Sequence, residues 1–239
     1  MVYSIKKISK KFGKYYALKN IDLEINENEK IVIIGPSGSG KSTFLRCLNT
    51  LEMPTSGEIY FHNMKLTAHT YKNTYGKIGM VFQNFQLFNN LTVIENLTLA
   101  PILNKIMSKE DAYKKAKEYL KQIHLEDKLN TYPKKLSGGQ QQRVAIVRTL
   151  MMDPEVILFD EPTSALDPEM IEEVLTLIME VAKKNITMIV VTHELKFAYD
   201  FATRVIFMDE GKIVEDGLKE QIFNNPQTER LQKFLSNIK

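Results

Sequence analysis

The hydrophobic residues of the chain fall into short apolar runs and into alternating segments. Ile31–Ile34, Val156–Phe159 and Ile186–Thr192 are predominantly apolar runs, the pattern of strands buried on both faces of a parallel sheet. Val2–Ile8 and Ala17–Ile25 instead alternate apolar and polar positions, which predicts two strands with one solvated face. Shorter strands are expected at Glu58–His62, Lys77–Phe82, Val205–Met208 and Gly211–Val214.

The middle of the chain changes to a helical pattern. Apolar residues recur at helical spacing in Thr92–Leu103 and Lys109–Ile123, and lysines occupy the opposite face of the second segment. Because this block interrupts a strand-rich chain, we expect residues 84–152 to be an inserted helical subdomain of a single domain whose β-rich core is 1–83 and 153–239. Further helices are predicted after Lys41, after Ser137, over Glu169–Ala182 and in a final amphipathic segment that runs to Lys239.

The composition of the chain indicates a globular protein with a large hydrophobic core. The 239-residue chain is long enough to bury a large core, and 44% of its residues are hydrophobic. Its net charge of +3 comes from scattered lysines, so no nucleic-acid partner is expected. The single cysteine, Cys47, fits a reducing compartment and is expected to be a small core residue. No apolar run approaches the roughly 18 residues of a membrane span, so we expect a soluble, cytoplasmic chain.

The run Ile31–Ile34 leads directly into a segment that matches G-x-x-x-x-G-K-[ST] at every fixed position. Glycines let the backbone N–H groups of such a loop converge on one anion, and a helix starting near Lys41 adds the positive end of its dipole. We expect Lys41 to bridge the β- and γ-phosphates of a nucleoside triphosphate and the Ser42 hydroxyl to ligate Mg²⁺. The predicted phosphate loop comprises Gly35, Pro36, Ser37, Gly38, Ser39, Gly40, Lys41 and Ser42.

Polar groups follow two further buried strands, at the edge where parallel sheets bind their ligands. Asp160 and Glu161 end the Val156–Phe159 run. We expect Asp160 to hold Mg²⁺ through a water and Glu161 to act as general base for the attacking water. His193 ends the Ile186–Thr192 strand and is expected to hydrogen-bond the γ-phosphate and orient that water. The structural alternatives are a simple strand-ending turn and a surface histidine.

Two further features are open to more than one interpretation. Ser137 is a good N-cap, and the two glycines that follow it leave N–H groups open to an anion. This segment is either a second phosphate-binding helix start or a linker-like turn. An aromatic side chain near the N-terminal hairpin could stack on adenine, and Phe12, Tyr15 and Tyr16 all qualify, with packing in the sheet as the alternative.

Taken in order, these segments resemble the motif set of an ABC-transporter ATPase subunit, with a phosphate loop, Q-loop, signature, acidic strand, D-loop and switch histidine. The resemblance covers essentially the whole chain, and P-loop proteins in general lack Leu-Ser-Gly-Gly-Gln. It implies an α/β P-loop NTPase (RecA-like) core with an N-terminal antiparallel β subdomain and an inserted helical subdomain. The matching segments are Gly35–Ser42, Gln83, Leu136–Gln140, Val156–Glu161, Ser164–Asp167 and His193.

The resemblance also implies the cofactors, ATP and Mg²⁺, and further residues that contact them. Phe12 occupies the family's adenine-stacking position, and Thr43 joins the phosphate contacts. Gln83 would sense Mg²⁺ and the nucleotide at the hinge to the helical subdomain. Glu161, His193 and Lys41 would be the catalytic residues.

In this family two copies pack head to tail as a homodimer with ATP at the interface. The signature of one chain caps the γ-phosphate held by the other, and hydrolysis lets the two chains separate. The remaining nucleotide contacts implied by the resemblance are Ser137, Gly139, Gln140 and Asp167.

The runs LRCLN, VFQNFQLF and LSGGQQQRVAIVR look most like ATPases of bacterial polar amino acid uptake systems. Such a subunit would lie on the cytoplasmic face of the cell membrane, bound to transmembrane permease subunits and indirectly to an extracytoplasmic solute-binding protein. An exporter, or an importer of another small solute, is the alternative. Phe85, Leu87 and Phe88 either form the groove for a permease helix or belong to the core.

Overall fold

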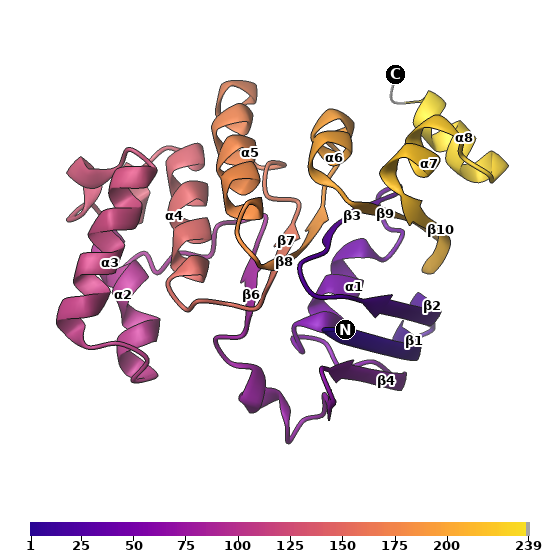
Figure 1. Ribbon diagram of the computed structural model, residues 1–239, viewed down its shortest axis with the longest axis horizontal. Helices are drawn as coiled ribbons and strands as arrows, with labels where there is room; N and C mark the ends of the chain where they lie inside the picture. The colour runs from indigo at the N-terminus through magenta and orange to yellow at the C-terminus, as the bar shows by residue number, and fades with distance from the viewer. Residues whose placement is uncertain (238–239) are drawn as a thin grey trace.

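The computed structural model describes residues 1–237, which form two β-sheets with helices between and around them (Figure 1). One sheet is antiparallel with strand order β2-β1-β4-β5, and the other is mainly parallel with strand order β10-β9-β3-β8-β7-β6. The strands are β1 (Tyr3–Phe12), β2 (Tyr15–Ile25), β3 (Lys30–Ile34), β4 (Ser56–Phe61), β5 (Met64–Lys65), β6 (Ile78–Val81), β7 (Val156–Asp160), β8 (Thr187–Val191), β9 (Arg204–Asp209) and β10 (Lys212–Leu218). The helices are α1 (Lys41–Leu48), α2 (Val93–Leu103), α3 (Lys109–Gln122), α4 (Gly138–Leu150), α5 (Pro168–Ala182), α6 (Leu195–Phe201), α7 (Lys219–Asn224) and α8 (Glu229–Ser236).

The alternation of side chains along β3 separates two cores. Ile31 and Ile33 belong to the core shared with the antiparallel sheet and α1, so α1 lies between the two sheets (Figure 1). Val32 and Ile34 belong to the core on the opposite face, which α5, α6, α7 and α8 cover. Every residue of β3, β7 and β8 is buried, as the unbroken apolar runs predict.

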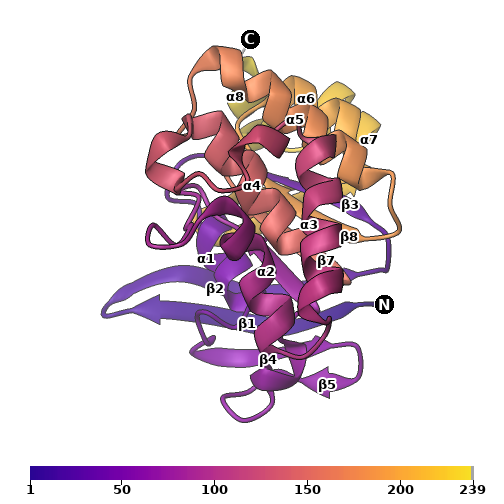
Figure 2. The same ribbon diagram turned by 90° about the vertical axis from the view of Figure 1, so that its left-hand side faces the viewer.

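Helices α2, α3 and α4 stand together at one end of the molecule, opposite α7 and α8 (Figures 1 and 2). They share a third core that includes Leu97, Leu120 and Val144. Thr92 and Ser137 begin α2 and α4 with reciprocal capping boxes, each worth about 1 kcal/mol on removal of the cap.

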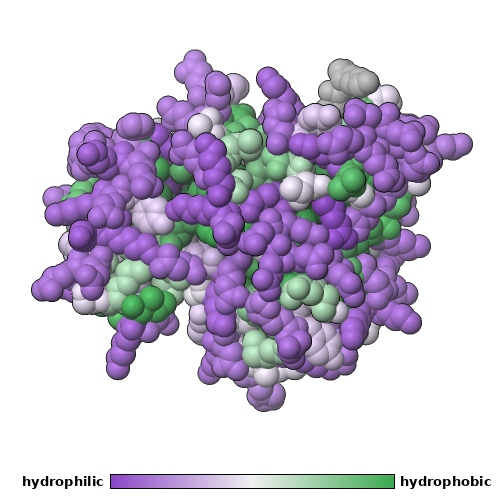
Figure 3. Space-filling model, in the orientation of Figure 1, coloured by the Kyte–Doolittle hydropathy of each residue, from purple (hydrophilic) through white to green (hydrophobic). Residues whose placement is uncertain are grey.

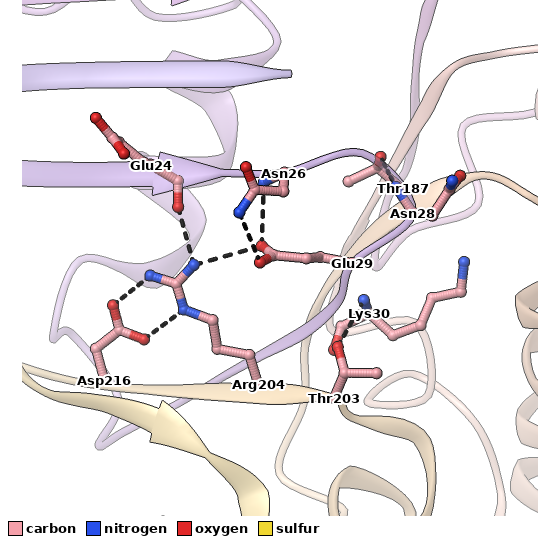
Figure 4. Close-up of polar contacts among 9 residues, drawn as sticks. All are labelled: Glu24, Asn26, Asn28, Glu29, Lys30, Thr187, Thr203, Arg204 and Asp216. Atoms are coloured by element: carbon pink, nitrogen blue, oxygen red, sulfur yellow. Dashed lines mark hydrogen bonds and ion pairs between the residues drawn. The ribbon is translucent and has the colours of Figure 1, made fainter. Parts of the chain in front are cut away.

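A polar cluster ties the two sheets together at the start of β3 (Figure 4). Arg204 donates to both carboxylate oxygens of Asp216 at 2.6 and 2.5 Å, and also to the Glu24 carbonyl at 2.9 Å. Its Nη1 lies 3.4 Å from Glu29 Oε2 in the β2–β3 turn. The hydrogen bond to Asp216 raises the pKa of the guanidinium, so the ion pair persists throughout the neutral range. These contacts fix the β2–β3 turn against β9 and β10.

The C-terminal region differs from the prediction of one helix. The chain forms α7 and α8 with a break at Pro226, because proline disfavours a helical conformation in the preceding residue. The Glu215 carboxylate accepts hydrogen bonds from the backbone N–H groups of Gln227 and Thr228, and the Thr228 side chain then caps α8. The predicted end of the helix at Lys239 lies outside the described residues.

Two other segments were not anticipated. The α6 helix, Leu195–Phe201, follows the β8 strand, and the segment 63–76 contains the short strand β5 and a 3-10 turn at Tyr71–Thr74. In the described part of the chain, no helix combines the length and the hydropathy needed to cross a bilayer. The face in Figure 3 is mostly hydrophilic, with separate apolar areas.

Candidate functional site

The phosphate loop connects the carboxyl end of β3 to the first residue of α1. Gly35 has φ +148°, and a Cβ there would lie 2.0 Å from the Met208 carbonyl oxygen of β9. Gly40 caps α1 with φ +102°, and its Cβ would lie 2.4 Å from the Ala17 carbonyl oxygen. Backbone from β2 and β9 thus packs directly on the loop at positions where only glycine fits.

The Lys41 side chain curls back into this loop. Its Nζ donates hydrogen bonds to the carbonyl oxygens of Gly35 at 2.8 Å and Pro36 at 2.9 Å. Lys41 is only 4% exposed. Burial lowers the pKa of its ammonium group, and the nearby carboxylates of Glu161 and Asp160 oppose that shift. A buried cation held by neutral carbonyls is well placed to pair with phosphate.

Ser42 and Asp160 meet beside the loop. The Ser42 hydroxyl donates to Asp160 Oδ1 at 2.6 Å, and Arg46 Nη2 lies 3.9 Å from Asp160 Oδ2. Burial raises the pKa of the Asp160 carboxyl, against the hydrogen bond from Ser42 and the charges of Arg46 and Lys41. The arrangement places a hydroxyl and a carboxylate, both hard oxygen donors, next to the first turn of α1.

Glu161 and His193 converge from neighbouring strands. Glu161 follows β7 with φ +48°, an uncommon value for a residue with a side chain, and its N–H donates to the Val191 carbonyl of β8 at 3.0 Å. His193 Nε2 lies 3.1 Å from Glu161 Oε1. Glu161 also lines the cleft over the phosphate loop, whereas His193 is not among the lining residues and approaches the cleft through Glu161.

A cleft of about 280 Å³ opens over the phosphate loop. Phe12 and Tyr15 both line the cleft, and the Tyr15 hydroxyl donates to the Gly38 carbonyl at 3.2 Å. Tyr16 does not line the cleft. Lys11 Nζ lies 5.1 Å from the centre of its ring, and Lys10 Nζ lies 4.9 Å from the centre of the Phe12 ring. All three aromatic residues are exposed, so they do not pack inside the sheet. The full lining is Phe12, Tyr15, Ala17, Ser37, Gly38, Gly40, Lys41, Ser42, Thr43 and Glu161.

The signature segment lies outside this cleft. Ser137 Oγ accepts from the Gln140 N–H at 3.3 Å, and Gln140 Oε1 accepts from the Ser137 N–H at 3.1 Å. The Gly139 N–H points at Met170 Sδ, 3.2 Å away on α5. The residues that line the cleft include none of α4, and Figure 1 shows α4 among the helices at one end. The folded chain therefore does not bring Ser137, Gly139 or Gln140 to its own phosphate loop.

Gln83 and Asp167 lie at the ends of other elements. Gln83 is exposed just after β6, and Asp167 is the exposed N-cap of α5, where its side chain accepts no capping hydrogen bond.

Two residues near the site were not predicted. Arg46 approaches Asp160 from α1, and the Gly211 N–H donates to the Ser39 carbonyl of the phosphate loop at 3.0 Å. Arg46 has a sequence signal, because four residues after Ser42 places it on the same helix face. Gly211 has none, because nothing in the sequence indicates which loop its turn contacts.

Comparisons with known proteins identify the family of the chain. The profile of a family described as ABC transporter matches residues 18–164. The arginine transport ATP-binding protein ArtM of Bacillus subtilis is 52% identical over 237 residues, 98% of each chain. The glutamine transport ATP-binding protein GlnQ of Geobacillus stearothermophilus is 49% identical over 240 residues, 100% of this chain and 99% of the relative.

A solved structure of a dimeric ATP-binding cassette, MJ0796 bound to ADP and Pi, superposes with a TM-score of 0.82. It is 41% identical, and the match covers 91% of this chain and 98% of that one. The predicted α/β P-loop NTPase fold is confirmed. This chain belongs to the ABC transporter family, as one of its ATP-binding, ATP-hydrolysing subunits.

Proposed function

We propose that this chain powers the uptake of a polar amino acid through a membrane permease. Both relatives described above are named for amino acid transport, of arginine in one case and glutamine in the other. The chain would lie on the cytoplasmic face of the membrane, and an extracytoplasmic solute-binding protein would deliver the solute to the permease. The selectivity for one amino acid would belong to these partners.

Within one chain, the cleft over the phosphate loop would hold ATP. The loop Gly35–Thr43 would surround the phosphates, with Lys41 turning from its carbonyl partners to the β- and γ-phosphates. Phe12 would stack on adenine. The hydrogen bond from the Tyr15 hydroxyl to the Gly38 carbonyl would hold Tyr15 against the phosphate loop. Glu161 would accept the proton of the attacking water, and His193 would orient both the Glu161 carboxylate and that water.

Mg²⁺ fits the donors at this site. The Ser42 hydroxyl and the Asp160 carboxylate supply hard oxygen ligands, and a cation there would compensate a carboxylate that is only 5% exposed. Gln83, at the exposed end of β6, would be a third oxygen donor. When bound, Mg²⁺ would neutralise charge on the phosphate oxygens.

The names of the two relatives support amino acid uptake, and the position of Ser137, Gly139 and Gln140 outside the cleft of their own chain supports the head-to-tail dimer. Their helix start is capped by Ser137, and the N-terminus of a helix attracts anions through its dipole. A head-to-tail homodimer would bring this helix start, with Asp167 beside it, to the γ-phosphate held by the partner. In this arrangement residues 84–152 act as the subdomain that presents the signature, and 1–83 with 153–239 as the nucleotide-binding core.

A groove of about 390 Å³ between α2, the segment 71–79 and the end of α1 is the candidate docking site for a permease helix. Its surroundings include large exposed apolar side chains at Leu51 (55% exposed) and Tyr75 (59% exposed). None of the three residues suggested by sequence lines this groove. Leu87 packs against the core of α2, α3 and α4, Phe85 is partly buried, and Phe88 is half exposed.

The test mixes two inactive variants. Ser137→Arg blocks the signature, and Lys41→Ala removes the ammonium group that would pair with the phosphates. Each variant alone is therefore expected to hydrolyse no ATP. In a random 1:1 mixture, about a quarter of the composite sites would combine an intact Lys41 with an intact Ser137 from the partner. We expect ATPase activity up to about that fraction of wild type. The matched control mixes Lys41→Ala with the double variant Lys41→Ala/Ser137→Arg, which leaves no intact Lys41 and should show no activity. Lack of activity at every ratio in the first mixture would contradict the head-to-tail dimer.

A further inference from the structure

The segment that follows Gln83 has an unusual backbone. Phe85 has φ +50° and Gln86 has φ +54°, so two consecutive residues with side chains adopt the left-handed conformation. L-residues rarely do so, and such pairs persist only when their surroundings hold them. We call residues 84–88 the post-β6 loop.

Arg148 of α4 holds this loop from one side. Its Nη1 donates to the Gln86 carbonyl at 2.5 Å and its Nη2 to the Phe85 carbonyl at 3.4 Å. Its guanidinium carbon lies 5.9 Å from the centre of the Phe88 ring. Burial lowers the pKa of this guanidinium, whose acceptors here are neutral main-chain carbonyls. Both hydrogen bonds of Arg148 thus go to the carbonyls of the two residues with left-handed backbone.

Asn96 of α2 holds the other end of the loop. This side chain is 1% exposed. Its Oδ1 accepts from the Phe88 N–H at 2.8 Å, and its Nδ2 donates to the Phe88 carbonyl at 3.1 Å. The loop is therefore attached at both ends to the helices α2 and α4.

The loop also contacts the first turn of α4. A Cβ built on Gly138 would lie 3.6 Å from Phe85 Cζ, which places the Phe85 ring against the residue next to Ser137. Arg148 and Gly138 are at opposite ends of α4, so one helix contacts both the backbone and the ring of Phe85.

From these contacts we infer that Arg148 is a positioning residue for the ATPase reaction: it locks the post-β6 loop, which directly follows Gln83, to α4, which begins directly after Ser137. The inference rests on the proposed function, because Ser137 acts on the nucleotide of the partner chain. Without Arg148, the left-handed residues would relax, the Phe85 ring would leave Gly138, and the start of α4 would lose its fixed relation to Gln83.

The test compares Arg148→Lys with Arg143→Lys. Lysine keeps the charge but cannot donate to two carbonyls in one plane. Arg143 is the matched control on α4, because it donates to the Ile123 carbonyl at 2.9 Å and pairs with Glu173 at 3.2 Å, away from the loop. For Arg148→Lys we expect kcat to fall by roughly 10- to 100-fold, since a misplacement of about 1 Å has an effect of that order. The Kd for ADP of the monomer should stay within about twofold, because no residue of α4 lines the cleft in the described chain.

Three further measurements distinguish a positioning role of Arg148 from a general effect on stability. Amide exchange of residues 84–88 should accelerate in Arg148→Lys and remain unchanged in Arg143→Lys. In a Glu161→Gln background, Arg148→Lys should raise the ATP concentration needed for half-maximal dimer formation about tenfold. Phe85→Leu, which removes the ring but leaves Arg148 in place, should reproduce the loss of kcat.

Wild-type kcat and dimer midpoint in Arg148→Lys, alongside faster exchange of the loop, would overturn the inference, because the arginine would then only stabilise the loop. Wild-type kcat in Phe85→Leu would also overturn it. If Glu161→Gln alone forms no dimer in ATP, the proposed function fails. In that case the kcat of Arg148→Lys still decides whether the arginine affects hydrolysis.

Discussion

His193 Nε2 lies 3.1 Å from Glu161 Oε1, although the residues are 32 positions apart in the chain. The parallel register of β7 and β8 pairs Asp160 with Val191, so residues just beyond the two strand ends meet. Glu161 is held there in a left-handed conformation, at a cost of about 1–2 kcal/mol for a residue with a Cβ. Its N–H bond to Val191 and its carbonyl bond from Ser164 compensate for that cost. The carboxylate is thus oriented before any substrate arrives.

The substitution Glu161→Gln keeps the shape and the hydrogen bond to His193 but removes the basic carboxylate. We expect phosphate release to fall by at least about 100-fold, the usual contribution of a general base. The Kd for ADP should stay within about twofold, and an ATP-bound dimer should accumulate in size-exclusion chromatography with light scattering. Glu172→Gln, an exposed position on α5, is the control and should keep full activity. Normal turnover in Glu161→Gln would show that another group activates the water.

Cys47 offers a probe of the phosphate-loop helix. It is 1% exposed on α1, and burial raises the pKa of its thiol from 9.0 to about 12. Because the thiolate is the reactive form, iodoacetamide at about pH 8 should label the folded chain at least about 100-fold more slowly than the chain in urea. Mg·ADP should slow the labelling further, because it binds only the folded state. Fast labelling of the folded chain would contradict the burial of this side chain.

The raised pKa of Cys47 also determines whether the free energy of unfolding rises or falls with pH. The folded-state pKa of Cys47 is raised, so its stabilising contribution is complete below the unfolded value near 9.0 and is lost as pH rises towards about 12. The Tm of wild type should therefore fall more steeply above about pH 9 than the Tm of Cys47→Ala. Parallel Tm curves for the two proteins across that range would count against the shift.

The sequence indicates where a polar side chain lies when that side chain comes at or after the end of a buried strand. Lys41, Asp160 and His193 come after the runs that form β3, β7 and β8, and the parallel register of these strands brings their carboxyl ends to one edge. The apolar runs therefore indicate that these side chains lie at one edge of the sheet, and the strand order β3-β8-β7 comes from the structure.

What the sequence does not reveal is contact between segments joined by no local pattern. Arg148 donates to the Gln86 carbonyl across 62 positions, and Gly211 reaches Ser39 through the β9–β10 turn. Both contacts use backbone acceptors, which every residue offers, so residue types carry no information about the partner. Pro226 is a local sequence signal for the break between α7 and α8. The hydrogen bonds from the Gln227 and Thr228 N–H groups to Glu215, which hold the chain between these helices, have no such signal.

Gly211 is expected to control nucleotide affinity although it belongs to none of the motifs. Its N–H donates to the Ser39 carbonyl at 3.0 Å, and its carbonyl accepts from the Lys19 N–H at 2.8 Å. With φ at +80°, a Cβ would lie 2.8 Å from the Ala17 carbonyl oxygen, so alanine must displace either β2 or the phosphate loop. We expect Gly211→Ala to raise the Kd for ADP about tenfold, equivalent to about 1.4 kcal/mol, measured by calorimetric titration.

Gly76 is the matched control, because it also has φ +80° but its Cβ would meet only side-chain ends, Met152 Cε at 3.0 Å and Ile106 Cδ1 at 3.7 Å. Gly76→Ala bears the same backbone strain and should lower Tm, yet leave the Kd for ADP within about twofold. If both variants weaken ADP binding equally, strain alone explains the effect and the Gly211–Ser39 contact has no special role. If only Gly211→Ala does so, the β9–β10 turn is part of the support that shapes the phosphate loop.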